Sequence, residues 1–232
     1  LVVMDGVGET DKDNGNAVMH AYKPNLDELK KTALYTTIKA HGTAVGLPSD
    51  DDMGNSEVGH NALGSGQIYS QGAKLVNESI ESGAIYDTKA WKELTDNVKA
   101  NNSTLHFIGL LSDGNVHSHI ANLKSMIKNA KAAGVKKVRV HALLDGRDVP
   151  ETSALIYVED LESTMKELND ANFDSRIASG GGRMYITMDR YEADWSMVDR
   201  GWKAHVLGLG RQFSSAKEAI ETYRTEGGHV SD

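Results

Sequence analysis

The stretch LHFIGLLSDGNVHSHIANLKSMIKNAKAAGVKKVRVHALLDGRD, residues 105–148, decides how most of this chain folds. Residues 105–111 form a short apolar run, residues 119–133 carry apolar side chains at helical spacing, and residues 135–144 are again apolar and rich in valine. A strand, a helix and a second strand in succession are typical of α/β architecture. We therefore predict an α/β fold, with the two apolar runs as strands and the segment between them as a helix.

The same alternation extends to both sides of this stretch. The hydrophobic pattern predicts further helices at residues 74–82, 88–100, 153–172, 195–206 and 215–226, and a short strand at 176–178. Regular alternation of this kind indicates one continuous α/β domain, which we place at residues 75–232.

The first part of the chain has a different character. Residues 1–4, Leu-Val-Val-Met, predict a buried strand that stops at Asp5, and residues 35–45 predict extended structure. A helix is expected to begin at Pro24. Residues 46–72 hold six glycines and predict loops that lead into a short helix. We therefore treat residues 1–70 as a separate domain, and we expect residues to precede this chain because it opens inside an apolar run.

Composition excludes several classes of function. The chain has 33 acidic and 25 basic side chains and a formal net charge of −8, which argues against a nucleic-acid partner. It has no cysteine, so disulfides, thiolate nucleophiles and cysteine-ligated zinc are excluded, and any metal must bind oxygen or imidazole. No apolar run approaches the roughly 20 residues that span a bilayer. We expect a cytoplasmic protein without a membrane partner.

Three predicted strands end in polar loops that contain glycine, at residues 113–114, 145–148 and 180–183. In open α/β sheets, ligands bind beyond the carboxyl ends of the strands, so these loops should converge on one site. Arg147 and Arg183 lie in two of the loops. Arginine at a strand end suits phosphate or carboxylate because its planar guanidinium donates two parallel hydrogen bonds. The alternative for each is a solvated surface ion pair of little energetic value.

Three other residues could carry chemistry, and each has a simpler alternative. Asp5 follows the first predicted strand and could bind a divalent cation, or it could only terminate the strand at a turn. Ser56 stands where a helix is expected to begin; it could be a nucleophile at the positive end of that helix, or its N-cap. His117 could hydrogen-bond an anion, or it could pair with His119 as a metal ligand.

Five segments together carry a family resemblance. They are VVMDGVGE at residues 2–9, GNSEVGHNALGSG at 54–66, SDGNVHSH at 112–119, ALLDGRDVP at 142–150 and ASGGGRMYITMDRY at 178–191. In these segments the chain resembles the cofactor-independent phosphoglycerate mutases, a metal-dependent family related to alkaline phosphatases. The motifs are long, occur in the family's order and extend over nearly the whole chain.

The resemblance implies a fold and a reaction. It implies that residues 1–70 are part of an alkaline-phosphatase-like α/β domain and that residues 75–232 are an inserted α/β transferase domain, incomplete at its C-terminal end. The family interconverts 3-phosphoglycerate and 2-phosphoglycerate through a phosphoserine and without 2,3-bisphosphoglycerate. Because the family's other metal ligands lie in sequence beyond residue 232, we expect this chain to be an N-terminal part of the enzyme that is inactive alone.

The resemblance also implies roles for individual residues. Ser56 corresponds to the nucleophile and to a metal ligand, and Asp5 to a second metal ligand. Two divalent cations are expected, manganese with magnesium or cobalt as alternatives, in a monomer. The residues that correspond to substrate-binding groups are His117, Arg147, Asp148, Arg183 and Arg190.

Two other functions fit the residues. The first is a metal-dependent phosphatase of the same superfamily, against which Arg147, Arg183 and Arg190 argue, because a phosphatase has no need of transferase clamps. The second is a small-anion binding module without catalysis, which would suit the isolated chain.

Overall fold

The structure is a computed structural model that describes residues 1–4, 7–189 and 191–227. The chain divides into two compact units, Leu1–Gln71 and Gly72–Asp232, and each is described by itself. None of the described helices is long and apolar enough to cross a membrane.

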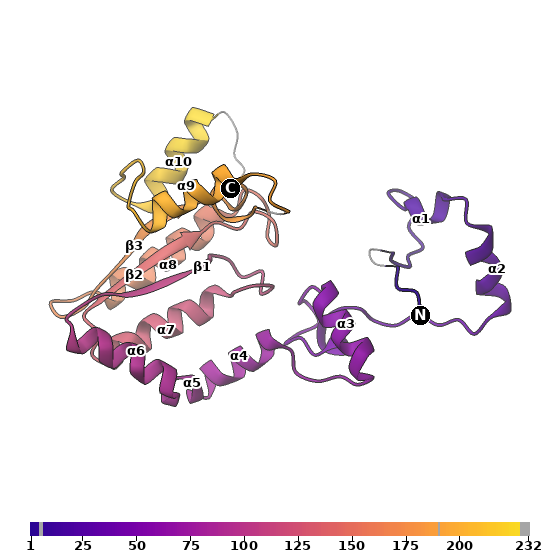
Figure 1. The fold of residues 1–232 in the computed structure, drawn as a ribbon, viewed down its shortest axis with the longest axis horizontal. Helices are drawn as coiled ribbons and strands as arrows, with labels where there is room; N and C mark the ends of the chain where they lie inside the picture. The colour runs from indigo at the N-terminus through magenta and orange to yellow at the C-terminus, as the bar shows by residue number, and fades with distance from the viewer. Residues whose placement is uncertain (5–6, 190, 228–232) are drawn as a thin grey trace. The chain divides into compact units, whose positions relative to one another are not determined.

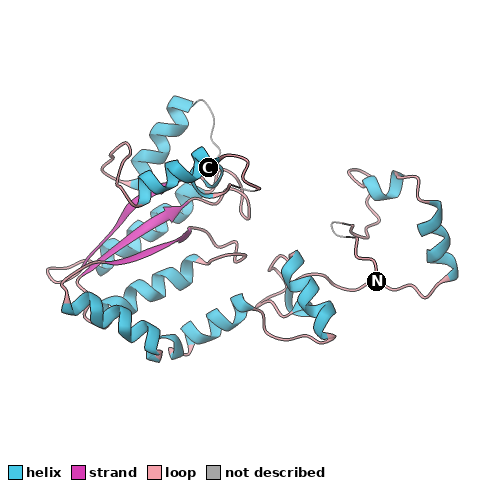
Figure 2. Cartoon of the chain, viewed as in Figure 1, coloured by secondary structure: helices cyan, strands magenta, loops and turns pink. Residues whose placement is uncertain are grey.

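The second unit is built on a three-stranded parallel sheet (Figure 2). Its strands are β1 (Leu105–Leu110), β2 (Lys137–Leu143) and β3 (Asp174–Gly181), in the order β1-β2-β3. Both neighbouring pairs are parallel, as helical crossovers between successive strands require. The predicted α/β architecture is therefore confirmed for this unit.

Helices precede, connect and follow the strands along the chain (Figure 1). They are α4 (Gly72–Glu81), α5 (Ala84–Asp87), α6 (Lys89–Ala100), α7 (Ile120–Ala132), α8 (Ala154–Leu168), the π-helix η2 (Arg183–Thr187), α9 (Trp195–His205) and α10 (Ala216–Gly227). The helices expected from the hydrophobic pattern are confirmed to within a few residues, except that α8 stops at Leu168. Neither α5 nor η2 was expected.

One face of the sheet forms the core of the unit. Along β2, Val138, Val140 and Ala142 are buried, whereas the residues between them are half-buried. The buried set packs with side chains of α7 and α8, among which Ile127 and Leu161 are fully buried. Burial of each such side chain contributes about 1.5–3 kcal/mol. The opposite face of β2 is covered only in part, and α9 lies against it beside β3.

The described residues of the first unit form four short helical segments. They are α1 (Ala17–His20), α2 (Pro24–Thr32), the 3-10 helix η1 (Gly42–Val45) and α3 (Ser56–Ser65). The helix expected at Pro24 is confirmed, with proline in the first turn, where its missing N–H costs nothing. A small cluster of Val45, Leu47 and Val58 forms its core.

Gly46 fixes how this small core closes. Its φ of +84° lies in the left-handed region, and a Cβ there would stand 1.8 Å from the carbonyl oxygen of Tyr69. The backbone N–H of Gln71 donates to the Gly46 carbonyl at 2.9 Å, and its side chain donates to the Val45 carbonyl at 3.0 Å. Only glycine allows this approach.

Two predictions for the first unit are wrong. Residues 1–4 are exposed and irregular rather than a buried strand. All strands among the described residues belong to the second unit, so residues 1–4 have no neighbour with which to form a ladder, and an apolar run without one does not become a strand. Residues 35–45 are extended only in part, because residues 42–45 form η1.

The third strand is longer than its apolar residues indicate. The sequence predicts a strand at 176–178 followed by a glycine loop, but β3 continues through Gly180 and Gly181. A Cβ at Gly180 would lie 2.8 Å from the carbonyl oxygen of Ala142, so the absence of a side chain there lets the backbone approach β2. Low strand propensity is overridden by this packing.

A pair of glycine substitutions tests the packing of α9 on η2. At Gly201 in α9, a Cβ would stand 2.2 Å from the carbonyl oxygen of Ile186, whereas Gly72 in α4 has open space. We expect Gly201→Ala to lower the free energy of unfolding by about 1–3 kcal/mol, because backbone cannot yield to the new methyl group. Gly72→Ala is expected to cause no loss. Chemical denaturation of both variants checks this, and equal stability of the two would contradict the packing.

Candidate functional site

The loops after the three strands meet, as their positions in the sequence predict. Ser112 follows β1, Asp145 follows β2 and Arg183 follows β3. The Ser112 hydroxyl donates to Oδ2 of Asp145 at 2.5 Å, and Nη1 of Arg183 donates to Oδ1 of the same carboxylate at 2.9 Å. One carboxylate therefore joins the ends of all three strands.

Asp145 is buried, with 4% of its surface exposed, and it also shapes its own loop. Its Oδ1 accepts the backbone N–H groups of Arg147 at 3.2 Å and Asp148 at 2.9 Å, a side-chain turn typical of aspartate. Burial alone would raise the pKa of Asp145, but the bonds from Ser112, the two backbone groups and Arg183 outweigh it and lower the pKa below its usual value. The carboxylate therefore stays ionised.

Arg183 bridges two carboxylates. Its Nη1 lies 2.9 Å from Oδ1 of Asp145 and 2.8 Å from Oδ2 of Asp148, and only 5% of its side chain is exposed. Burial lowers the pKa of Arg183 and the two carboxylates raise it, with a net rise. Nε and Nη2 make no hydrogen bond within the described part of the chain. Those two nitrogens remain available for a ligand.

The first loop comes close to the second at Asp148. Nε2 of His117 lies 3.8 Å from Oδ2 of Asp148, and a Cβ on Gly114 would stand 3.0 Å from Cβ of the same aspartate. The structure thus brings together three of the predicted substrate-binding residues, His117, Asp148 and Arg183. His119 takes no part, because its Nδ1 accepts the backbone N–H of Ala121 as the N-cap of α7.

Arg147 is the exposed cation of this cluster. Its Nη1 lies 3.2 Å from Sδ of Met188, and it makes no ion pair with any described carboxylate. Thioether sulfur is only a weak acceptor, so this contact holds the guanidinium loosely. Arg147 can therefore donate to an anion without first breaking an ion pair.

Two contributors to the cluster were missed in the sequence. Ser112 is the first residue of the segment at 112–119 but was given no role, and a hydroxyl next to a strand end was the available signal. Tyr157 comes from α8, and its hydroxyl donates to Oδ1 of Asp113 at 2.6 Å. Burial and this carboxylate raise the pKa of Tyr157 to about 12. A tyrosine within a helical pattern gives no signal of this contact, which depends on the tertiary packing.

Ser56 lies in the first unit, at the first residue of α3. The cap of this helix is Asn55, whose side chain accepts the backbone N–H of Val58 at 3.1 Å. The alternative that Ser56 is merely an N-cap is therefore wrong. Its hydroxyl is exposed at the positive end of a ten-residue helix, where negative charge is stabilised.

His60 stands one turn after Ser56 and contacts it twice. Its Nδ1 lies 2.7 Å from the Ser56 carbonyl oxygen and 3.2 Å from Oγ. Because a carbonyl oxygen only accepts, the shorter contact requires a proton on Nδ1. In that tautomer Nδ1 cannot take the hydroxyl proton, so His60 is not the base for Ser56 in this arrangement.

The fit of a metal to this chain is partial. Asp5 and Arg190 lie outside the described residues. Among the residues that are described, no group of three or more histidine, cysteine, aspartate or glutamate side chains is placed to hold a metal ion. Ser56 is an oxygen donor of the kind that manganese and magnesium accept, but it has no described partner ligand. Further ligands must come from outside the described residues if a metal binds here.

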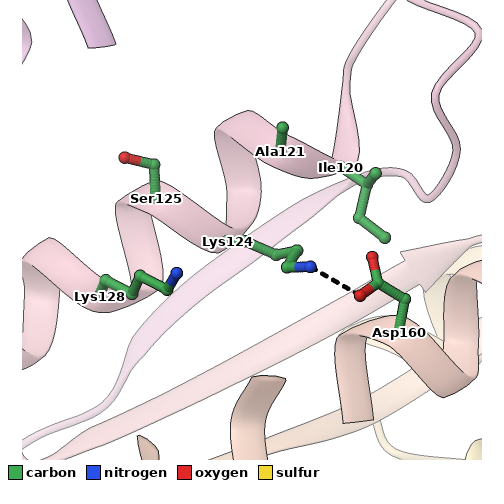
Figure 3. Close-up of a pocket in the computed structure, with 6 residues that line it drawn as sticks. All are labelled: Ile120, Ala121, Lys124, Ser125, Lys128 and Asp160. Carbon is green, nitrogen blue, oxygen red and sulfur yellow. Dashed lines mark hydrogen bonds and ion pairs between the residues drawn. The ribbon is translucent and has the colours of Figure 1, made fainter. Parts of the chain in front are cut away.

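A surface pocket of about 280 Å³ lies between α7 and α8 (Figure 3). It is lined by residues of α7 and α8: Ile120, Ala121, Lys124, Ser125, Lys128 and Asp160. Nζ of Lys124 is paired with Asp160 at 2.6 Å, as Figure 3 shows. This pocket holds none of the predicted site residues, and we do not take it as the functional site.

Comparisons with known proteins cover the whole chain. A family model described as "BPG-independent PGAM N-terminus" matches residues 76–232. A probable 2,3-bisphosphoglycerate-independent phosphoglycerate mutase of Leptospira interrogans is 59% identical over 100% of this chain and 43% of its own length. The 2,3-bisphosphoglycerate-independent phosphoglycerate mutase of Trypanosoma brucei brucei is 52% identical over 100% of this chain and 42% of its own.

A solved structure is similar as well. Crystal structures of Leishmania mexicana phosphoglycerate mutase at low cobalt concentration include a chain that matches with a TM-score of 0.89 and 51% identity, over 99% of this chain and 42% of that one. The present chain therefore spans less than half the length of the relatives that it matches.

The role of Asp145 as the common acceptor can be tested by stability. Asp145→Asn leaves Arg183 buried with a single carboxylate, and we expect a loss of about 3 kcal/mol in the free energy of unfolding. The loss should shrink as the pH falls below the usual aspartate pKa of 3.8, since the lowered pKa of Asp145 means that its contribution is complete above that pH and is lost as its own carboxyl protonates.

The matched control is Asp160→Asn, which removes the exposed partner of Lys124 and should cost less than about 1 kcal/mol. Denaturant titration of both variants at pH 7 and pH 3 makes the comparison. If Asp145→Asn costs no more than the control, Asp145 does not hold the three loops together.

Proposed function

Because this chain belongs to the BPG-independent phosphoglycerate mutase N-terminus family, we propose that the protein of which it forms a part interconverts 3-phosphoglycerate and 2-phosphoglycerate. Independence from 2,3-bisphosphoglycerate and passage through a phosphoserine are parts of the same proposal. The observation that carries it is similarity over the full chain at 52–59% identity to relatives with this name, so that Ser56 and the arginine cluster both lie in the matched region.

Ser56 is the proposed nucleophile. Its Oγ attacks the phosphorus of 3-phosphoglycerate, the bond from phosphorus to the C3 oxygen breaks, and that oxygen takes up a proton while the serine hydroxyl loses one. The retained glycerate then attacks the phosphoserine with its 2-hydroxyl, which forms 2-phosphoglycerate and restores the serine. The exposed position of Ser56 in the first turn of α3 supports this role, because the helix end stabilises negative charge on the transferred group.

Two divalent cations belong to the proposal, manganese with magnesium or cobalt as alternatives. Ser56 and Asp5 would contribute ligands, with the others from outside the described residues. A bound dication would supply the alkoxide form of the serine and neutralise charge during transfer, which a serine hydroxyl cannot achieve alone at neutral pH. The related Leishmania mexicana structure was obtained with cobalt, which supports a divalent ion.

The strand-end cluster is the proposed substrate site. Arg147 would bind the phosphate or carboxylate directly, and Arg183 would donate from Nε or Nη2 while Nη1 remains on Asp145 and Asp148. His117 would add a hydrogen bond beside Asp148. Arg190 completes the proposed set. A firm grip matters because the glycerate must stay bound while its hydroxyl groups exchange places.

The division of the chain after Gln71 supports a proposal of two domains. We assign residues 1–70 to part of an alkaline-phosphatase-like, metal-binding domain and residues 75–232 to an inserted phosphotransferase domain. A monomer in the cytoplasm remains our prediction.

The nucleophile can be tested in the full protein that contains this chain. Ser56→Ala is expected to lower mutase turnover on the order of 10⁴-fold with manganese present, because no other group replaces the attacking oxygen. Binding of 3-phosphoglycerate, measured by calorimetry, should persist. Ser65→Ala, at the other end of α3, is the matched control and should leave turnover unchanged. Retained mutase activity in Ser56→Ala would exclude Ser56 as the nucleophile.

The anion-binding role of Arg147 gives a separate test in the same protein. Arg147→Ala should weaken binding of 3-phosphoglycerate by about 10- to 100-fold, the range of one or two charge-assisted hydrogen bonds. Arg176→Ala removes another exposed arginine, one that is paired with Asp174, and should not change the affinity. Calorimetry checks both variants. Unchanged affinity in Arg147→Ala would make it a solvated surface residue.

A further inference from the structure

Four polar side chains form a hydrogen-bonded chain across the partly covered face of the sheet. Nδ1 of His106 lies 2.9 Å from Nε2 of His141, and Nδ1 of His141 lies 2.6 Å from Oγ of Ser179. The same hydroxyl lies 2.7 Å from Nδ1 of His205. The chain thus runs from β1 through β2 and β3 to α9.

The alignment of these groups depends on an irregularity in the sheet. The register between β2 and β3 shifts between Val140 and His141, which places Ser179 opposite His141 and on the same face. The rings of His106 and His141 stack at 5.2 Å, and those of His141 and His205 meet edge to face at 5.7 Å. Nε2 of His205 is buried and has no hydrogen-bond partner among the residues that the structure describes.

The geometry limits how many protons the chain can hold. In the direct contact between His106 and His141, one nitrogen must carry a hydrogen and the other must not, so both rings cannot be cations while the bond survives. A proton on His205 in addition to one on His141 would place two cations side by side and deprive the Ser179 hydroxyl hydrogen of its acceptor. The chain therefore accepts one proton, and a second breaks it.

Among the described residues, none of the carboxylates on the sheet or on α9 forms an ion pair with a histidine of this chain, so none offsets an added proton. On the sheet, Arg139 and Arg176 are paired with Asp174; on α9, Lys203 is paired with Asp199. Arg183 at the start of η2 is held by its own two carboxylates. Burial, followed by the other two histidines, lowers the pKa of His141, and burial lowers the pKa of His205. No other charged group among the described residues contributes to the lowered pKa of either histidine.

Release of α9 from the sheet would also affect η2 and Arg183 of the strand-end site. Gly201 of α9 packs against the Ile186 carbonyl of η2, and Nε of Arg200 donates to the Tyr185 carbonyl at 3.0 Å. The first residue of η2 is Arg183. The position of α9 on the sheet is thus linked through one short helix to the site described above.

We propose that His106, His141, Ser179 and His205 form a pH-sensitive clasp, which fixes α9 to the sheet near neutral pH and releases it in mild acid. The clasp is a property of the fold and does not depend on the proposed mutase function, because its opening is measured without any substrate. Its link to Arg183 would make anion binding weaken at the same pH.

The lowered pKa values of His141 and His205 determine in which direction pH changes the stability of the clasp. A histidine freed from the clasp regains a pKa near 6.5 and binds a proton more readily than one held in it. The clasp therefore stabilises α9 fully above about pH 6.5 and loses this effect as the pH falls through the lowered values. For each proton taken up on release, the opening equilibrium constant rises about tenfold per pH unit within this window.

Amide hydrogen exchange of the whole chain tests the proposal. After correction for the intrinsic pH dependence, the amides of residues 195–205 should open about 10- to 100-fold more readily per pH unit as the pH falls from 6.5 to 5, for one or two protons. Amides of α7, a helix that packs on α4 and α8, should show no such change. Equal opening of α9 at pH 7.5 and pH 5 would overturn the proposal.

Two variants separate the clasp from a general effect of acid. Glutamine in His205→Gln keeps a donor and an acceptor but cannot titrate. The increase in the opening of α9 on acidification should therefore be about tenfold smaller per pH unit than in the unaltered chain. Ser179→Ala breaks the chain at every pH, so α9 should open readily even at pH 7.5. His41→Gln changes an exposed histidine of the first unit and serves as the control. If the α9 amides of both clasp variants exchange as in the unaltered chain at every pH, the histidines do not fix α9.

Discussion

The buried carboxylate of Asp145 is the interaction on which the strand-end site depends. A charge with 4% exposure is unfavourable unless it is fully hydrogen-bonded, and each bond that satisfies it comes from a different part of the site. Ser112 closes the first loop onto it, its own backbone turn shapes the second, and Arg183 ties the third. The three parallel strands bring these loops to one edge, and the carboxylate fixes them there.

The same arrangement determines where positive charge is available. Asp145 and Asp148 together exceed the single charge of Arg183, so this buried group carries a net negative charge and cannot attract an anion by itself. Arg147 stands on the same loop and is exposed, and within the described part of the chain its guanidinium contacts only a thioether. Arg183 thus holds the loop at residues 145–148 in place, and Arg147 of that loop is exposed to an incoming anion. The formal net charge of −8 for the chain says little about such a site, since recognition at short range is set by local donors.

Much of this could be predicted from the sequence, for reasons that differ between elements. Apolar periodicity gave the sheet and most helices of the second unit, because those segments bury one face against each other. The meeting of the loops followed from the carboxyl ends of adjacent strands. The prediction of a strand at residues 1–4 was wrong because apolar composition does not supply a neighbouring strand for pairing. The predicted third strand was shorter than β3 because glycine is typical of loops, even where it permits close contact between strands. The structure also showed that Asn55 caps α3, so the Ser56 hydroxyl is not used as the cap, where the local pattern left both possibilities open.

The hydrogen-bond partners of the site residues could not be predicted from the sequence. Nothing in the motif around Arg183 indicates that its Nη1 is occupied by two carboxylates, and nothing marks Tyr157 as the donor to Asp113, because both contacts depend on how α8 and η2 pack. The most direct test of the account is a crystal structure of the full protein with 3-phosphoglycerate bound. We predict that the ligand contacts Arg147 while Asp145 keeps its bonds to Ser112 and Arg183. A ligand bound elsewhere, or an Asp145 turned away from both partners, would contradict it.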